Sequence, residues 1–213
     1  MNGVFITGSN TEVGKTTVSV EIIKHLRKKR QIVVRKPVET DCEVVNGAYV
    51  PEDAIKLNQA CASGESIEVV CPFCYELEAS PEEASLQAER PLELVDLVRA
   101  CQANVGEHFV FIEGAGGIYS PIANKALNSD LAVELGMPII IVVKDELGAV
   151  GQALLAINAA DSHKLDIVCV VLNEMEPNHL SNAESLSAYT KTPVIEYSKN
   201  KQKHFFVEIE KLI

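Results

Sequence analysis

The sequence predicts an α/β protein whose mostly parallel β-sheet is flanked by helices. Short, continuous runs of apolar residues recur along the chain, as in strands that are buried on both faces. The first two of these runs, residues 4–6 and 32–34, are joined by residues 17–30, in which apolar side chains recur with helical spacing. A strand, a helix and a strand in this order form a right-handed crossover, which places its two strands parallel.

The remaining segments continue the alternation of helices and strands. We expect, in order, a helix from Pro51, a loop over 63–81, two helices over 81–104 interrupted at Pro91, a buried strand at 108–113, an apolar strand at 138–143, an alanine-rich helix at 148–160, an apolar strand at 167–172, a helix near 182–189, a short strand near 193–196 and a tail helix. No linker or low-complexity segment divides the chain, so we expect one domain over residues 1–213.

The charge balance excludes some classes of partner. Acidic residues outnumber basic ones by 30 to 19, and the formal net charge of −11 opposes docking on nucleic acid or an anionic membrane. The basic cluster at residues 27–30 is expected to close the first helix, where it complements the helix dipole. The longest apolar stretch, residues 137–143, is too short to span a bilayer, and no export leader stands at the N-terminus. We therefore expect a cytoplasmic protein.

The six cysteines are expected to be free thiols in such a protein. Cys71 and Cys74 have the C-x-x-C spacing of a zinc or redox site. No second Cys or His pair lies at a supporting distance, so an ordinary structural pair is the favoured interpretation.

A glycine-bounded loop joins the first predicted strand to the first predicted helix. Gly8 and Gly14 bound this loop, and Lys15-Thr16 stands at the helix entrance. Backbone N–H groups of such a loop bind phosphates, the lysine contacts the β- and γ-phosphates, and the threonine hydroxyl binds Mg²⁺. The segment is therefore interpreted as the P-loop of a P-loop NTPase, with five rather than the usual four residues between its glycines. The alternative is a strand-to-helix turn with an incidental Lys-Thr pair.

Residues at the ends of other predicted strands suit the same site. Lys36 and Thr40 follow the second strand, and open α/β sheets place ligands at the carboxyl ends of their strands, although an ordinary strand-end charge would also explain Lys36. Glu113 ends the third strand, which is the Walker B position where a carboxylate completes the Mg²⁺ shell. The glycine-rich residues 114–117 then let backbone amides approach a ligand. Asn173 ends a later strand, where its carboxamide could pair with adenine or simply form a turn.

The starts of two other predicted helices indicate a function less specifically. Asp53 lies near the start of the helix from Pro51, and its spacing alone indicates only a partner for the helix dipole. Gly148 and Gly151 lie in the first turn of the alanine-rich helix. Small residues there leave the first N–H groups accessible to a carboxylate ligand or to a close subunit contact.

Six segments together resemble one known family. They are, in chain order, GSNTEVGKT, KPVET, PEDA, VFIEGAGG, LGAVGQ and VVLNEM. They resemble the corresponding segments of dethiobiotin synthetase and run through nearly the whole chain. The resemblance implies a doubly wound sheet, a homodimer, and closure of the ureido ring of dethiobiotin that depends on ATP and Mg²⁺. The family forms this ring from 7,8-diaminopelargonate and CO₂ by way of a carbamate and a carbamic-phosphoric anhydride, and it releases ADP and phosphate.

The resemblance also implies roles for individual residues. It places catalysis on Lys15 and Lys36, and substrate contacts on Thr11, Thr40 and Gly148, the last from the partner subunit. It places Mg²⁺ on Thr16, Asp53 and Glu113. Nucleotide contacts fall on Glu12, Val13, Gly14, Lys15, Thr16, Thr17, Asp53, Glu113, Gly114, Ala115, Gly116, Asn173, Ser198, Lys199 and Asn200.

The chain departs from the family pattern at three places, and other functions compete with the one implied. Asn10 stands where the family often has an acid, Glu82 where it commonly has His, and residues 197–200 lack the usual proline-containing stretch. A partitioning ATPase usually carries an extra lysine early in the loop, and residues 9–11 contain none. An amidoligase would need a glutaminase partner or domain. A regulator gated by nucleotide, without chemistry, would bind ATP without responding to diaminopelargonate.

Overall fold

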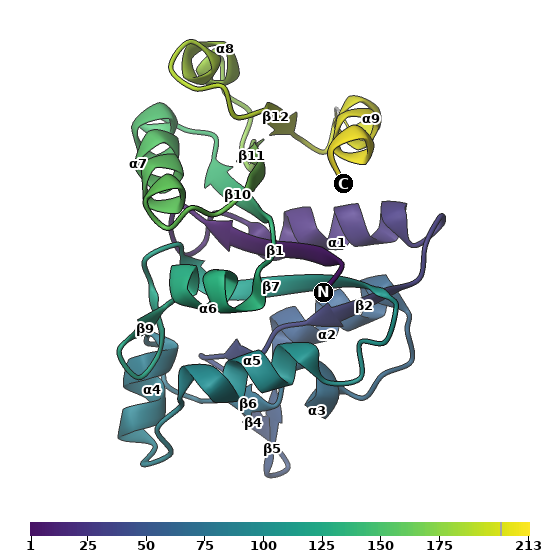
Figure 1. Ribbon diagram of the computed structural model, residues 1–213, viewed down its shortest axis with the longest axis vertical. Coiled ribbons are helices and arrows are strands. Elements are labelled where there is room, and N and C mark those ends of the chain that lie inside the picture. The colour runs from purple at the N-terminus through teal and green to yellow at the C-terminus, as the bar shows by residue number, and fades with distance from the viewer. Residues whose placement is uncertain (201) are drawn as a thin grey trace.

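The structure, a computed structural model, describes residues 1–200 and 202–213. Its centre is a six-stranded sheet with the order β12-β11-β10-β1-β7-β2, in which all neighbouring strands are parallel (Figure 1). The strands are β1 (Gly3–Gly8), β2 (Ile32–Arg35), β7 (Phe109–Gly117), β10 (Ile139–Lys144), β11 (Ile167–Asn173) and β12 (Val194–Tyr197). The chain runs from β1 to the β2 edge and back through β7, then away on the other side of β1. The sheet is therefore doubly wound, as the sequence predicts.

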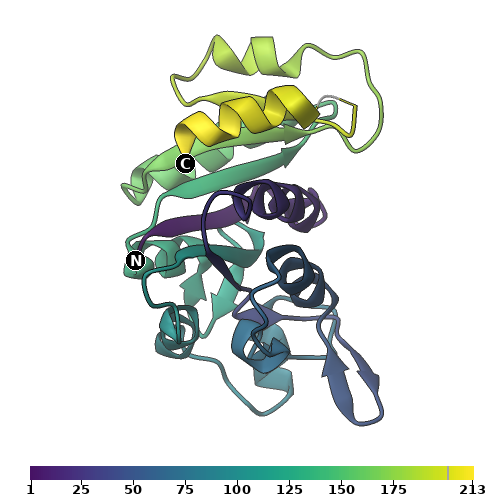
Figure 2. The same cartoon turned by 90° about the vertical axis from the view of Figure 1, so that its right-hand side faces the viewer.

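Helices cover both faces of this sheet (Figures 1 and 2). One face packs against α1 (Lys15–Leu26), α2 (Glu52–Cys61) and α9 (Gln202–Leu212), and the other against α5 (Leu94–Gln102), α6 (Asn128–Leu135), α7 (Ala149–Ser162) and α8 (Asn182–Ser187). Along β10, Ile140 and Val142 belong to the first core, whereas Ile139 and Ile141 belong to the second. Because successive side chains of a strand point to opposite faces, one continuous apolar run supplies both cores.

The loop predicted over residues 63–81 is wrong. This segment contains the short helix α3 (Ile67–Val70) and the strand β6 (Phe73–Cys74), which pairs in parallel with β3 (Val38–Glu39). Backbone hydrogen bonds from Lys36 N to the oxygen of Val70 (2.9 Å) and from Tyr75 N to the oxygen of Glu39 (3.1 Å) extend this pairing. The strand forms because a partner distant in the sequence satisfies its backbone, so no local pattern indicated it.

Two predicted boundaries are also wrong. The first helix ends at Leu26 instead of residue 30, and the basic cluster follows it as a turn. In that turn Arg27 donates a hydrogen bond to the oxygen of Ala60 (2.9 Å), and the guanidinium of Arg30 lies 4.8 Å from the centre of the Phe109 ring. These contacts fix the cluster without helical geometry. The third predicted strand continues past Glu113 to Gly117, because Gly117 still pairs with Gly8 of β1 after a register shift.

Most other elements are confirmed. The two helices around Pro91 are α4 (Pro81–Gln87) and α5, and the first of them is capped by Ser80, whose Oγ accepts a hydrogen bond from Glu83 N (3.3 Å). The helix from Pro51 is α2, and the tail helix is α9. In the part of the chain that the structure describes, we find no helix of sufficient length and apolar character to cross a membrane.

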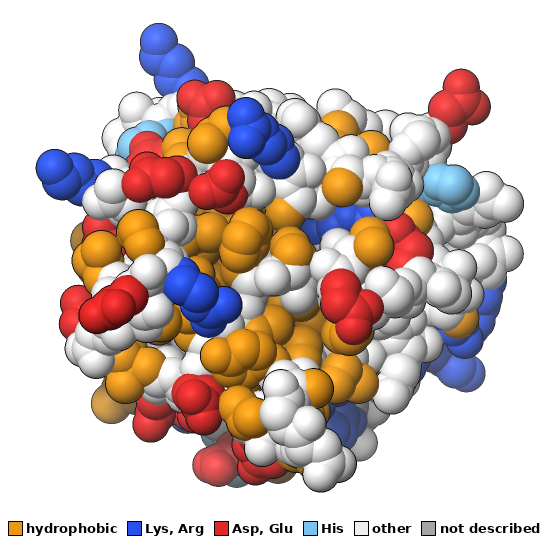
Figure 3. Space-filling view, turned by 90° about the horizontal axis from the view of Figure 1, so that it is seen from below, with side chains coloured by type: hydrophobic (Ala, Val, Ile, Leu, Met, Phe, Trp, Pro, Cys, Tyr) orange, Lys and Arg blue, Asp and Glu red, His pale blue; other side chains and the backbone are white. Residues whose placement is uncertain are grey.

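Neither α6 nor the two antiparallel hairpins was predicted from the sequence. One hairpin joins β4 (Glu43–Val45) to β5 (Ala48–Val50), and the other joins β8 (Pro121–Ala123) to β9 (Ala126–Leu127). Asn46 and Gly47 both have positive φ (53° and 79°), so the Asn-Gly turn typical of hairpins was a missed signal. The β4–β5 hairpin projects from the molecule (Figure 2), and the face viewed from that end gathers hydrophobic side chains among charged ones (Figure 3).

Candidate active site

The P-loop lies between the carboxyl end of β1 and the start of α1. Gly14 has φ 82° and precedes the helix, and a Cβ added to it would lie 2.1 Å from Nδ2 of Asn173. Glycine is therefore required at this position both for the backbone conformation and for space. The same carboxamide of Asn173 donates a hydrogen bond to the oxygen of Val13 (2.9 Å). Asn173, predicted as either an adenine contact or a turn residue, packs directly on the phosphate-binding loop.

Glu113 is the centre of the hydrogen-bond network behind this loop. Its carboxylate is fully buried, and Oε1 accepts hydrogen bonds from Thr16 Oγ1 (2.8 Å) and Lys36 Nζ (3.1 Å). Oε2 accepts a hydrogen bond from Ser19 Oγ (2.7 Å). Thr16 of α1 and Lys36, which follows β2, thus meet at the carboxylate of Glu113 from β7. Ser19 was missed, although its position one helical turn after Thr16 places both hydroxyls on the same face of α1.

The two lysines of the site differ in pKa. Burial, together with repulsion from Lys36, lowers the pKa of Lys15 to about 8. Burial alone would also lower the pKa of Lys36, but the carboxylates of Glu113, Asp53 and Glu39 outweigh it and raise that pKa. Lys36 is therefore held as a buried ammonium, whereas Lys15 lacks an equally strong acidic partner; its Nζ donates to the oxygen of Asn10 (3.1 Å).

Asp53 faces the P-loop from the first turn of α2. It lines a cavity of about 710 Å³ together with residues 10–17 and Gln152. Its carboxylate also lies 3.8 Å from Nζ of Lys56. Asp53 is thus more than a partner for the helix dipole, which is all that its spacing in the sequence indicated.

The oxygen donors of the site suit a hard cation. The hydroxyl of Thr16 and the carboxylates of Asp53 and Glu113 are ligand types that Mg²⁺ prefers. Among the described residues, no group of three His, Cys, Asp or Glu side chains is arranged to hold a metal on its own. A Mg²⁺ ion that used these three residues would therefore share its shell with phosphate oxygens and water, as is usual for nucleotide sites.

The glycine-rich end of β7 is packed closely. A Cβ added to Gly114 would lie 2.3 Å from Oδ1 of Asn128. That fully buried asparagine accepts a hydrogen bond from Ala115 N (3.2 Å) and donates to the oxygens of Ala115 (2.6 Å) and Gly117 (2.9 Å). The oxygen of Gly114 accepts from Lys36 Nζ (2.9 Å). The amide of Ala115 is thus already bonded within the protein. Asn128 was not predicted, because no motif in the sequence marks it.

The C-terminal residues implied for the base lie next to the P-loop. β12 pairs Tyr197 with Asn173, and Tyr197 and Lys199 line a cavity of about 630 Å³ that also includes Thr16, Thr17 and Asp53. Ser198 is buried, and its hydroxyl has no hydrogen-bond partner among the described residues. Asn200 is exposed.

The predicted substrate residues lie around the same edge of the sheet. Thr11 is exposed in the P-loop, and a Cβ added to Gly116 would lie 3.7 Å from its methyl group. Thr40 is half-buried directly after β3. Gly148, with φ 95°, precedes α7 and has open space around it.

The cysteine pair has the features of a structural element. All six cysteines are free, and the sulfurs of Cys71 and Cys74 lie 3.7 Å apart. A hydrogen bond with Cys42 lowers the pKa of Cys74, but the contact with Cys71 and burial raise it to about 12. The Cys74 thiol therefore stays protonated at neutral pH, unlike that of a reactive cysteine.

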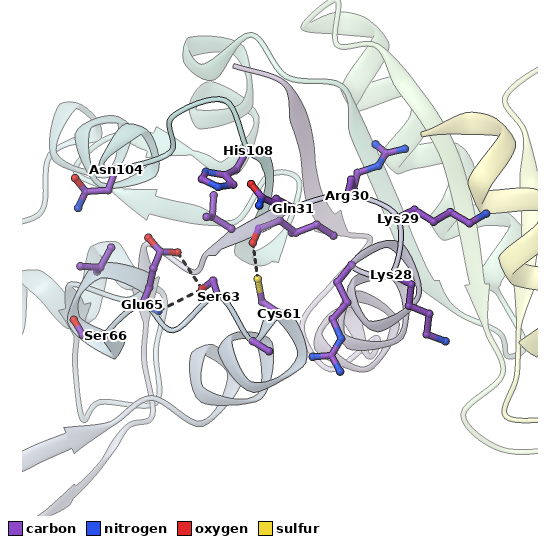
Figure 4. A pocket seen from close by; sticks show the side chains of 15 residues that line it. Lys28, Lys29, Arg30, Gln31, Cys61, Ser63, Glu65, Ser66, Asn104 and His108 are labelled. Carbon is purple, nitrogen blue, oxygen red and sulfur yellow. Dashed lines mark hydrogen bonds between the residues drawn. The ribbon is translucent and has the colours of Figure 1, made fainter.

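Another cavity lies at the amino ends of β2 and β7, away from the P-loop. It measures about 1100 Å³, and its lining includes the basic cluster of residues 27–30, residues 61–63, Glu65, Ser66 and His108. Figure 4 shows Lys28, Lys29 and Arg30 pointing away from Ser63 and Glu65, so their charges do not converge on one point. None of the predicted site residues lines this cavity.

Comparisons with known proteins agree with the geometry of the site. A family model described as an AAA domain matches residues 2–196. The "ATP-dependent dethiobiotin synthetase BioD" of Vesicomyosocius okutanii is 46% identical over 213 residues, covering 100% of this chain and 97% of the relative. The protein of the same name from Ruthia magnifica is 44% identical over 213 residues, covering 100% and 99%.

A solved structure supports the fold alone. A plasmid partition protein from Borrelia burgdorferi superposes with a TM-score of 0.60 over 100% of both chains, at 13% identity. Near-complete coverage at more than 40% identity by two synthetases, together with the P-loop and its buried Glu113, leaves one assignment: this chain belongs to the family of ATP-dependent dethiobiotin synthetases.

Proposed function

We propose that this protein closes the ureido ring of dethiobiotin from 7,8-diaminopelargonate, CO₂ and MgATP and releases ADP and phosphate. The observation that carries the proposal is the meeting of Thr16 and Lys36 at the buried carboxylate of Glu113, behind the P-loop. This arrangement joins a phosphate-binding loop to a permanently charged ammonium. A reaction that makes a carbamate and then phosphorylates it needs both.

The first step in this proposal is the formation of a carbamate on one substrate amine. An amine reacts with CO₂ only when it is neutral, and a nearby ammonium group lowers the pKa of that amine by repulsion. Lys36 supplies this charge because its carboxylate neighbours raise its own pKa. Once the carbamate forms, the same ammonium attracts the new anion. Thr40 and Thr11 would contact the substrate from the two sides of this position.

The second step transfers the γ-phosphoryl group to the carbamate oxygen. The loop residues Glu12 to Thr17 would hold the phosphates, with Lys15 beside the β- and γ-phosphates. Binding of these anions would raise the pKa of Lys15 from about 8, so the lysine would be charged when it is needed. Thr16, Asp53 and Glu113 would hold Mg²⁺, which supplies neutralising charge to the phosphate oxygens.

The last step needs no nucleophile from the protein. The second amine of the substrate attacks the mixed anhydride, and because it is already held nearby, ring closure gains roughly several kcal/mol from proximity. Gly114, Ala115 and Gly116 would line this region. Asn173, with Ser198, Lys199 and Asn200, would contact adenine.

We further propose that the whole chain works as one domain in a cytoplasmic homodimer. Leu147 lies just before α7 and Leu155 lies on it, and their side chains are 89% and 73% exposed. A partner subunit that packed on this helix would cover both. In the dimer, the helix start at Gly148 would meet the substrate carboxylate of the partner site. Sedimentation of the purified chain would test this, and a monomer at assay concentration would contradict it.

The decisive experiment measures ADP release from MgATP and bicarbonate, with and without diaminopelargonate, together with the mass of the product. One dethiobiotin per ADP, formed only in the presence of the diamine, is the expected result. ATP binding that ignores the diamine would overturn the proposal in favour of a nucleotide-gated regulator. Release of ADP without the diamine would instead favour another ATPase of the P-loop superfamily.

A further inference from the structure

The carboxylate of Glu39 touches no reacting group in the chemistry proposed above; it adds to the acidic surroundings of Lys36 and is buried beside the site. Its exposed fraction is 8%. Oε1 accepts a hydrogen bond from Asp53 N and Oε2 accepts one from Ala54 N, each at 2.9 Å. One side chain therefore binds two of the free N–H groups in the first turn of α2.

This helix has no other side chain to satisfy those groups. The residue at its N-cap is Pro51, and no side-chain capping bond forms there. Local caps such as Ser, Thr, Asp or Asn are the usual solution. Here the cap comes from 14 residues earlier in the chain, so it ties the start of α2 to another element.

That other element is itself fixed in place. Glu39 ends β3, where it is paired with Cys74 of β6, and its oxygen accepts the amide of Tyr75. Lys36 lies three residues before Glu39 in the same segment, and its amide bonds to Val70. The segment that carries the buried ammonium thus also determines where α2 begins.

The start of α2 determines the position of Asp53. The amide of Asp53 is one of the two donors to Glu39, and its side chain lines the P-loop cavity with Lys15 and Thr16. Any shift of the first turn of α2 would move this carboxylate relative to the phosphates.

We propose that Glu39 is a positioning residue, which holds the first turn of α2 so that Asp53 faces the metal bound to the nucleotide. The inference rests on the proposed function, because it takes Asp53 as a Mg²⁺ ligand. It adds a residue that touches neither metal nor substrate. Partners of this kind typically contribute 10- to 100-fold to metal affinity.

The test compares four single variants of the full chain: Glu39→Gln, Glu39→Asp, Asp53→Asn and the control Glu52→Gln. Glu52 lies in the same first turn of α2, but its carboxylate is exposed and pairs only with Lys56. Calorimetry measures ADP affinity with and without Mg²⁺, and the quantity compared is the gain in affinity that Mg²⁺ gives. Thermal unfolding is followed in parallel.

In Glu39→Gln and in Glu39→Asp, the factor by which Mg²⁺ increases ADP affinity should be roughly tenfold smaller than in the wild type. The affinity for ADP without metal should change less than twofold. Glu52→Gln should keep the full gain. A structural cap alone would lower the unfolding temperature of the Glu39 variants and leave the gain intact. Glu39→Asp keeps the charge while shortening the side chain, so it provides a second measurement should Glu39→Gln fold poorly.

Two results would overturn the inference, and they differ in whether the proposed metal site is also wrong. If Asp53→Asn loses the gain but both Glu39 variants keep it, Glu39 is only a helix cap. If Asp53→Asn also keeps it, the metal assignment in the proposed function falls as well. A double variant, Glu39→Gln with Asp53→Asn, should be no worse than Asp53→Asn alone, because the two residues act through the same contact.

Discussion

Positive charge is buried at one end of the parallel strands and exposed at the other. At the carboxyl ends, the ammonium groups of Lys15 and Lys36 are buried, and that of Lys36 is paired with the buried Glu113. At the amino ends of β2 and β7, the basic cluster of residues 27–30 rims the cavity of about 1100 Å³, and the side chains of Lys28, Lys29 and Arg30 point away from its opposite wall (Figure 4). Buried charges that converge act through a low dielectric, whereas exposed ones are screened by water and salt. Neither the size of a cavity nor the number of charges around it identifies the site. The site is identified by charged side chains that meet at one point, as Lys36 and Glu113 do.

The strongest test of this contrast is Lys36→Ala against Lys28→Ala. Loss of Lys36 should lower kcat about 10²- to 10³-fold, since it removes a charge used on the reacting group. It should also lower the free energy of unfolding by about 3 kcal/mol, because Glu113 is left buried without its cation. Lys28→Ala should keep kcat within twofold. A Lys36 variant that retains most of the wild-type kcat would refute the proposed role.

Glu113→Gln should have the next largest effect. A carboxamide has one acceptor oxygen where the carboxylate accepts from Thr16, Lys36 and Ser19, and it removes a ligand charge. We expect the Mg²⁺ concentration for half-maximal activity to rise roughly tenfold. Glu107→Gln, on the exposed side of the molecule, is the matched control. An unchanged Mg²⁺ titration would exclude Glu113 from the metal shell.

Replacing each of two glycines by alanine distinguishes the cost of a strained backbone from the effect of a clash at the site. Gly14 and Gly64 have nearly the same φ, 82° and 80°, but only Gly14 has a neighbour that a Cβ would strike. Gly64→Ala should therefore cost about 1–2 kcal/mol of stability and leave ADP affinity unchanged. Gly14→Ala should cost more and weaken ADP binding, as measured by calorimetry and thermal unfolding. Equal effects of the two changes on ADP affinity would contradict the packing of Asn173 on the loop.

The smallest effect is expected from Lys28→Gln. No ion pair of Lys28 is found among the described residues, and the side chain points away from the cavity it rims. Its loss should change neither ADP affinity by more than twofold nor the unfolding temperature by more than about 1 °C. A tenfold loss of ADP affinity would show that the basic cluster does influence the site.

The parts of the fold and of the site that are marked by a contiguous sequence motif could be predicted. The P-loop motif is contiguous, the buried strands are continuous apolar runs, and Glu113 directly follows one of them, so fold class and the central residues could be predicted. Ser19 was missed although its spacing from Thr16 offered a signal. Glu39 and Asn128 could not be predicted, because each bonds backbone groups of another segment and stands in no local motif. The strand at Phe73–Cys74 was missed for the same reason: its backbone is satisfied by β3, which no periodicity in residues 63–81 indicates.

The central position of β1 has a consequence for how the protein is made. β1 is the first strand to be synthesised, yet it pairs with Val110 and the residues after it in β7, and with Ile139 to Val142 in β10. Until those residues leave the ribosome, an apolar strand and the loop attached to it have no partners in the sheet. Folding around such distant contacts is slow, and exposed apolar strands invite aggregation. A truncated nascent chain that stops before β10 should therefore depend on chaperones, although it already contains the whole P-loop.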